Sequence, residues 1–213
     1  MRASPRKRSV RAAGALFIVI LAGCASDSAT LNSEHIARKY GNYAIEVIET
    51  NEFIRVSNLY SESATGRICR TFAVVQLTRQ REPSFASEHA QIVAGGSIGS
   101  VFKSRGWQIE KEHQYIGEIA IDSMSRRIVR LMRLDTPATA SIHVYNFRIS
   151  TGEVSFDYAM IAEVHHPDYL TAAMLRSIYG NSYSGPENRG IVGEMMEIVR
   201  LKLHDPMFGA SSE

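Results

Sequence analysis

The sequence predicts an α+β fold, with a mostly antiparallel sheet of about five to seven strands packed against a long middle helix and two C-terminal helices. Two observations carry this prediction. Segments that alternate apolar and polar residues, with the two-residue period of a strand, follow one another along the chain. These segments are not separated by regularly spaced helices, as the strands of a parallel sheet would be. A chain of 213 residues is long enough for one domain with a hydrophobic core.

The expected strands run through the middle of the chain. Residues 43–60 contain two short alternating runs separated by a polar turn. Residues 68–77 are apolar on both sides, as in a central strand covered on both faces. Residues 107–119 alternate like a strand with one exposed face. Residues 141–149 and 154–164 follow as two strands with hairpin chemistry between them.

Three helices are expected between and after these strands. The long middle helix spans residues 83–105, and a second spans residues 167–179; each opens on a proline and ends before a glycine. Residues 188–203 carry apolar side chains at helical spacing, and Asn188 is a potential cap for this third helix. Residues 121–134 fit both a helix and a strand, so their secondary structure stays open.

The N-terminus carries a motif of a different kind. Five basic residues and no acidic residue lie among the first eleven, and the apolar residues 12–21 follow. About ten apolar residues rise only ~15 Å as a helix, about half of a bilayer core, so we expect no permanent membrane span. The next residues are Ala22-Gly23-Cys24, and Leu21-Ala22-Gly23-Cys24 resembles the lipobox of bacterial lipoproteins.

This resemblance implies a location and an anchor. In such proteins a diacylglycerol is attached to the cysteine thiol, here Cys24, and the signal peptide is cut between Gly23 and Cys24. Two or three acyl chains then hold the protein stably on a membrane. Ala25 stands where aspartate would favour the inner membrane, so we expect the periplasmic face of the outer membrane in a bacterial envelope. The expected segments are a signal peptide (1–23), a lipid-anchored tether and lead-in (24–41), one domain (42–204) and a flexible tail (205–213).

The net charge and the cysteine content indicate which binding partners to expect. The chain has 24 basic and 22 acidic residues, and five of the basic ones precede Cys24. The remainder has 19 basic and 22 acidic residues, a net charge of −3, which argues against nucleic acid. The expected partners are the membrane, through the acyl chains, and other envelope proteins. Cys69 is expected to be a small apolar core residue. No cofactor is expected.

A possible nucleophile lies in Gly95-Gly96-Ser97-Ile98-Gly99, which satisfies the G-x-S-x-G pattern of a nucleophile elbow. That elbow needs a strand entering Ser97 and a helix leaving it, with a base such as His165 or His166. The alternative is that the preceding residues are helical and that the glycines form a smooth helix face or a kink.

A possible metal site lies in residues 163–168, where Glu163, His165, His166 and Asp168 are close in sequence. Glu163 and His165 would share one face of a strand, whereas adjacent histidines point to opposite faces. The alternative is a strand that runs into a helix, with Asp168 near the positive helix terminus.

The functional expectation is therefore a lipid-anchored, non-catalytic accessory or binding module of the envelope. The alternative is a lipid-anchored serine hydrolase that uses Ser97. A further hypothesis is a ligand-binding module with a pocket between the sheet and the long helix.

Overall fold

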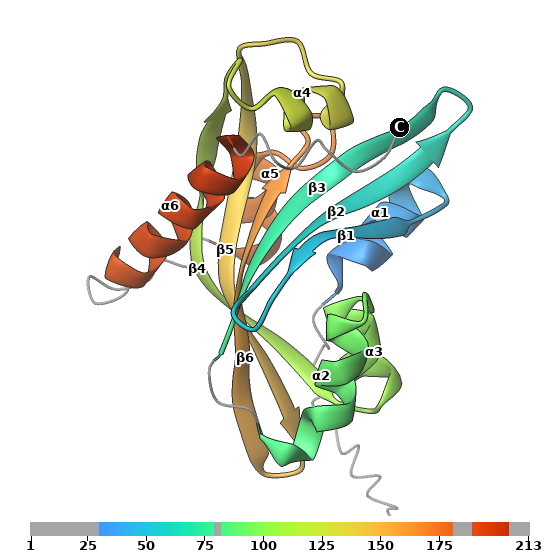
Figure 1. Cartoon of the computed structure of the whole chain (residues 1–213), viewed down its shortest axis with the longest axis vertical. Coiled ribbons are helices and arrows are strands. Elements are labelled where there is room, and N and C mark those ends of the chain that lie inside the picture. The colour runs from blue at the N-terminus through green and yellow to red at the C-terminus, as the bar shows by residue number, and fades with distance from the viewer. Residues whose placement is uncertain (1–29, 79–81, 181–188, 205–213) are drawn as a thin grey trace, which may run out of the picture.

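The computed structural model describes residues 30–78, 82–180 and 189–204. The expected signal peptide, Cys24, the possible cap Asn188 and the tail from residue 205 lie outside the described residues. Within the described part the chain forms a six-stranded antiparallel sheet and six α-helices, which confirms the predicted α+β class (Figure 1). None of the helices in these ranges is long and apolar enough to cross a membrane.

The sheet consists of two three-stranded meanders. Its strand order is β1-β2-β3-β6-β5-β4, so the pairing of β3 with β6 joins the two halves. The strands are β1 (Ala44–Thr50), β2 (Ile54–Ser63), β3 (Gly66–Leu77), β4 (Gln108–Ile121), β5 (Ala138–Thr151) and β6 (Val154–His165). The 14-residue strand β5 runs along the long, vertical axis of the molecule in Figure 1.

Helices cover both faces of this sheet (Figure 1). The helices are α1 (Asn32–Tyr40), α2 (Ala86–Val93), α3 (Ile98–Ser104), α4 (Arg126–Met132), α5 (Ala172–Tyr179) and α6 (Arg189–His204), and a 3-10 turn (Pro83–Phe85) precedes α2. Helices α4 and α6 pack on one face through residues such as Met132 and Val199. Helices α1 and α5 pack on the opposite face, and α2 and α3 cover its lower part.

The long middle helix expected over residues 83–105 is not one helix. Helix α2 ends at Val93 and α3 begins at Ile98, with a turn between them. Gly95 has a φ of +109°, which a continuing helix excludes and which glycine adopts without a steric penalty. Residues 121–134 fit both a helix and a strand by sequence. The structure gives a helix, α4, from Arg126 to Met132, and only Ile121 belongs to a strand, as the last residue of β4.

Two further helix boundaries depart from the expected segments. Residues Asn32–Tyr40, within the expected tether and lead-in, form α1, whose Ile36 is fully buried against the sheet. Helix α5 begins at Ala172, later than the expected start at residue 167, and the Thr171 side chain caps it by accepting from the Met174 amide.

Alternation along the central strands decides which side chains meet α1. On β6, Ala162 and Val164 pack in the core beneath α6, whereas Ile161, Glu163 and His165 lie on the other face. The α1 face is apolar near α2 and α3 and polar near α1 and α5, and this polar part holds the candidate site.

Candidate functional site

The α1 face of the sheet buries several polar and charged side chains. These residues come from five strands: Arg55, Ser57, Thr71, Lys111, His143, Glu163 and His165. Burying such groups costs free energy unless each one finds a partner. Their hydrogen bonds therefore show which groups are satisfied within the protein and which are left for a ligand.

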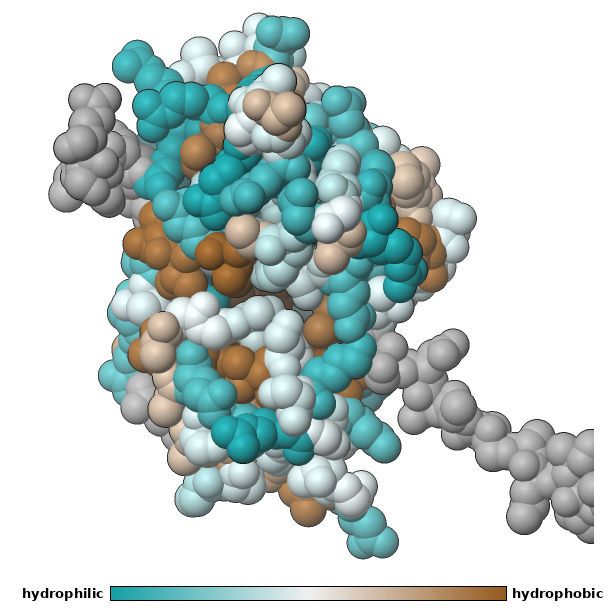
Figure 2. Space-filling model, turned by 90° about the vertical axis from the view of Figure 1, so that its right-hand side faces the viewer, coloured by the Kyte–Doolittle hydropathy of each residue, from teal (hydrophilic) through white to brown (hydrophobic). Residues whose placement is uncertain are grey.

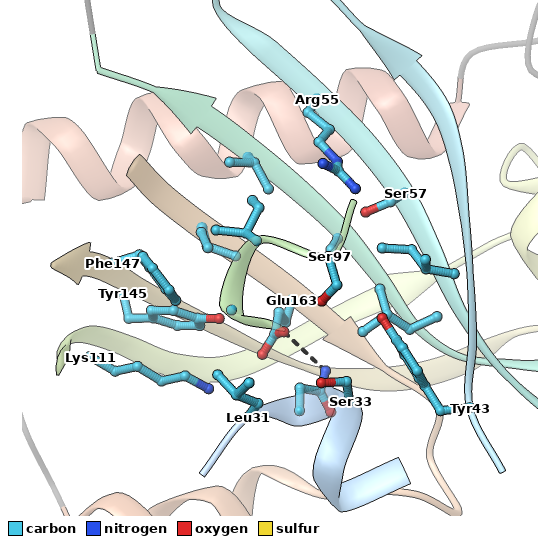
Figure 3. Close-up of a pocket in the computed structure, with 18 residues that line it drawn as sticks. Leu31, Ser33, Tyr43, Arg55, Ser57, Ser97, Lys111, Tyr145, Phe147 and Glu163 are labelled. Atoms are coloured by element: carbon cyan, nitrogen blue, oxygen red, sulfur yellow. Dashed lines mark hydrogen bonds between the residues drawn. The ribbon is translucent and has the colours of Figure 1, made fainter. Parts of the chain in front are cut away.

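A cavity of about 70 Å³ lies between the sheet, the start of α1 and the α2–α3 turn. Its apolar wall includes Ile45, Leu59 and Phe147. Ser97, Tyr43 and Glu163 project into it in Figure 3. Figure 2 shows the side of the molecule that faces right in Figure 1, where apolar residues gather near the middle among hydrophilic ones.

Arg55 is the cation at one end of this cavity. Arg55 is 1 % exposed, and its Nη1 donates to the Ile92 carbonyl at 2.7 Å. Its Nη2 has no hydrogen-bond partner among the described residues. Burial lowers the pKa of Arg55, and the groups that oppose this shift are Tyr158 and Tyr43 rather than a carboxylate. The guanidinium nevertheless stays charged, because arginine does not lose its proton in proteins.

The Tyr43 hydroxyl is a second unsatisfied group that lines the cavity. It is buried and lies near Ser97, without the geometry of a hydrogen bond. Burial raises the pKa of Tyr43, so its hydroxyl keeps its proton and can donate. Arg55 and Tyr43 thus offer two donors in one small space.

The other end of the cavity holds the charges of Lys111 and Glu163. Burial lowers the pKa of Lys111, and the negative charge of Glu163 opposes this shift. The Lys111 Nζ donates to the Thr30 carbonyl at 3.4 Å and lies 4.9 Å from the centre of the Tyr145 ring. The charges of Lys111 and Glu163 therefore compensate each other, whereas the charged groups that act on Arg55 do not include Glu163.

A hydrogen-bond network fixes Glu163 and His165 behind the cavity. Asn32 donates both amide hydrogens, one to Glu163 Oε1 and one to Thr71 Oγ1, each at 3.0 Å. Asn32 Oδ1 accepts from the Tyr169 hydroxyl at 2.6 Å, so the amide orientation is fully determined. Thr71 Oγ1 lies 3.0 Å from His165 Nδ1. Residues from α1, β3, β6 and the segment before α5 thus hold one another in place.

His143 lies beside this network on β5. Its Nε2 is 2.7 Å from His113 Nδ1, and its ring stacks against the His113 and Tyr179 rings at 4.9 Å. Burial lowers the pKa of His143 to about 2 and that of His165 to about 4. Both imidazoles are therefore neutral near pH 7.

Ser97 lines the cavity but lacks the surroundings of a nucleophile elbow. Residues 91–93 belong to α2, so a helix and not a strand precedes the turn, and Ser97 is the residue before α3. In the described part of the chain, no hydrogen bond joins Ser97 to His165 or His166. The serine-hydrolase alternative stays a prediction that this geometry does not favour.

The structure brings together only part of the metal set expected from residues 163–168. Glu163 and His165 lie on one face, as alternation indicates, and their third neighbour is His143. His166 lies apart, because its Nε2 bonds to the Met132 carbonyl at 2.9 Å and its Nδ1 accepts from the Asp168 amide. The sequence alone did not identify His143 or Arg55 as site residues. The signal that could have found them is that each is a polar residue on the buried side of a predicted strand.

Comparison of the chain with family models, curated proteins and solved structures gives no significant match.

Proposed function

We propose that this protein is a lipid-anchored binding module of the bacterial envelope, and that its cavity holds a small ligand with a carboxylate beside an apolar group. The Leu21–Cys24 motif supports the anchor. The observation that carries the ligand class is the buried Arg55 guanidinium at the cavity wall, whose Nη2 has no hydrogen-bond partner within residues 30–78, 82–180 and 189–204.

A carboxylate fits this position for an electrostatic reason. A buried cation without a counter-charge is costly, and hydrogen bonds to charged groups are stronger than those between neutral groups. A ligand carboxylate can accept from Arg55 Nη2 and from the Tyr43 hydroxyl. It would supply the negative charge that the groups around Arg55 do not provide.

The rest of the cavity limits the ligand's size and polarity. Ile45, Leu59 and Phe147 favour an apolar group next to the carboxylate. A volume of about 70 Å³ holds a head group and a few carbons and is far below the pocket of a drug-sized molecule. Covalent geometry also limits the distance from Cys24 to Thr30 to about 20 Å, so the anchor would keep the cavity near the leaflet.

Binding is tested with the full chain in detergent and a series of short fatty acids, each compared with the alcohol of equal length. We expect the acids to bind and to raise the melting temperature, and the alcohols to have at least a tenfold weaker effect. Arg55→Met should remove this preference, because it keeps the side-chain length and removes the charge.

Arg200→Met is the matched control, because Arg200 is an exposed cation on α6 that pairs with Glu197. Circular dichroism verifies the fold of each variant. Equal binding of acids and alcohols, or unchanged acid binding by folded Arg55→Met, would show that the ligand class is wrong.

A further inference from the structure

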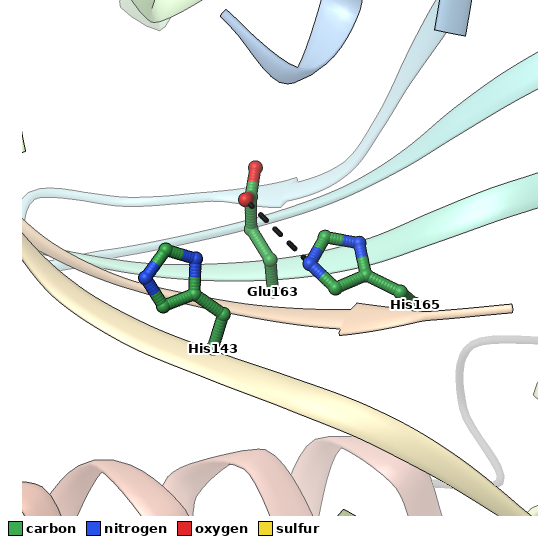
Figure 4. A group of neighbouring side chains, drawn as sticks. All are labelled: His143, Glu163 and His165. Carbon is green, nitrogen blue, oxygen red and sulfur yellow. Dashed lines mark ion pairs between the residues drawn. The ribbon is translucent and has the colours of Figure 1, made fainter. Parts of the chain in front are cut away.

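We propose that His143, Glu163 and His165 form a binding site for one divalent transition-metal ion of the zinc or iron(II) class. One ligand atom from each residue lies within 4.8 Å of the other two. All three side chains are buried, and Figure 4 shows the two imidazoles on either side of the carboxylate. Two neutral imidazoles and one carboxylate are a known donor set for both ions.

The rigid sheet places these three residues. His143 on β5 is directly opposite Glu163 on β6 in the antiparallel register, and His165 follows two residues further along β6 on the same face. Side chains at such positions are close neighbours across and along a sheet. The site therefore stands on two paired strands rather than on a loop, and paired strands hold ligands more precisely than loops.

The distance between His165 and Glu163 suits two ligands of one ion better than a direct hydrogen bond. His165 Nε2 lies 3.9 Å from Glu163 Oε2, which is too far for a hydrogen bond. Two ligands of one tetrahedral zinc ion lie about 3.3–3.6 Å apart, because the metal–ligand distances are about 2.0–2.2 Å. Side-chain shifts of about half an ångström would therefore bring this pair to coordination distance.

Each residue is held by a neighbour in the protein and has one atom directed toward the other two, and the Tyr145 hydroxyl also interacts with the Glu163 carboxylate. His165 Nδ1 contacts Thr71, while its Nε2 is buried and has no hydrogen-bond partner in the part of the chain that the structure describes. Glu163 Oε1 accepts from Asn32, and Oε2 faces His165. His143 Nε2 contacts His113, which leaves Nδ1 on the side of Glu163 in Figure 4. Partners of this kind orient the ligands of metal sites.

A small cavity borders the three proposed ligands. A cavity of about 10 Å³ is bounded by His143, Glu163, His165 and, on the α1 side, Asn32 and His35. This is about the space that one water molecule needs. The nearby Lys111 cation is balanced by Glu163 in the metal-free protein, so we expect moderate affinity.

The test uses the full chain in detergent, stripped with a chelator and dialysed against equimolar Zn²⁺ or Co²⁺. We expect one ion per chain by elemental mass spectrometry, a visible Co²⁺ spectrum of low-symmetry nitrogen and oxygen coordination, and a higher melting temperature with Zn²⁺. Mg²⁺ and Ca²⁺ should not compete, because hard cations prefer sites made only of oxygen ligands.

Glu163→Gln and His143→Asn should each weaken Zn²⁺ binding at least tenfold, so the result does not depend on the folding of one variant. His166→Asn is the matched control, because His166 is also buried and adjacent to His165 but lies against Met132. It should bind Zn²⁺ like the wild type.

Absence of stoichiometric Zn²⁺ binding by the wild type would overturn the proposal. Wild-type affinity in both folded ligand variants would do the same. Arg55→Met separates this inference from the proposed function, because it should lose the carboxylate preference and still bind Zn²⁺.

Discussion

At the scale of single residues, burial decides which chemistry is accessible. Arg55, Tyr43 and His165 keep unpaired atoms next to cavities, and these atoms carry both proposals. Cys69 illustrates the opposite case. Its thiol is fully buried, donates to the Thr71 carbonyl at 3.3 Å, and lies in the core beneath α6, as expected for a small apolar residue.

Cys69 should therefore be unreactive in the folded protein. Burial raises the pKa of its thiol from 9.0 to about 12, so almost no thiolate exists near pH 8. In Cys24→Ser, we expect Ellman's reagent to modify Cys69 only after denaturation. Rapid modification of the folded protein near pH 8 would contradict this assignment.

The raised pKa of Cys69 also makes the free energy of unfolding depend on pH. Since the folded pKa lies above the unfolded one, the unfolded state releases the proton first, and the free energy of unfolding falls as pH rises above about 9. The loss should be about 1.4 kcal/mol per pH unit for this group. The measurement is urea unfolding of Cys24→Ser and of Cys24→Ser/Cys69→Ala from about pH 8 to 11. The contribution of Cys69 is the difference between the two proteins in the slope of the free energy of unfolding against pH.

At the scale of elements, the α2–α3 turn is the clearest departure from the expected helix. The turn changes the direction of the chain between α2 and α3, and Ser97 and Ile98 line the cavity directly after it. Its backbone depends on Gly95, because a side chain at a φ of +109° is strained.

Gly95→Ala should lower the free energy of unfolding by about 1–3 kcal/mol. Gly193→Ala is the control: Gly193 is exposed within α6, an added Cβ meets nothing within 4 Å, and helix propensity should raise stability by up to about 1 kcal/mol. Urea unfolding measures both variants. A Gly95→Ala protein as stable as the wild type would mean that the turn does not depend on glycine.

At the scale of the whole molecule, the proposed anchor and the domain act together. The predicted mature chain has a net charge of −3 and no basic excess that would hold it on anionic lipid. Attachment would therefore rest on the acyl chains of Cys24, each buried methylene contributing about 0.8 kcal/mol.

Cell fractionation tests the anchor. The wild type should sediment with membranes and carry the mass of acyl chains on a chain that begins at Cys24. Cys24→Ser should appear in the soluble fraction, because the thiol that accepts the diacylglycerol is gone. Membrane attachment of Cys24→Ser, or an intact mass without acyl chains in the wild type, would contradict the lipoprotein prediction.

Sequence reasoning alone determined the fold class, the N-terminal motif and the common face of Glu163 and His165, because alternation and motif spacing are local properties of a chain. Tertiary structure decided the β3–β6 pairing, the arrival of His143 beside Glu163 and the place of Arg55 at a cavity. These depend on strand register and on contacts between residues far apart in sequence, such as Asn32 with Glu163. A single sequence carries no local signal for such contacts, because their free energy arises only when the elements pack together.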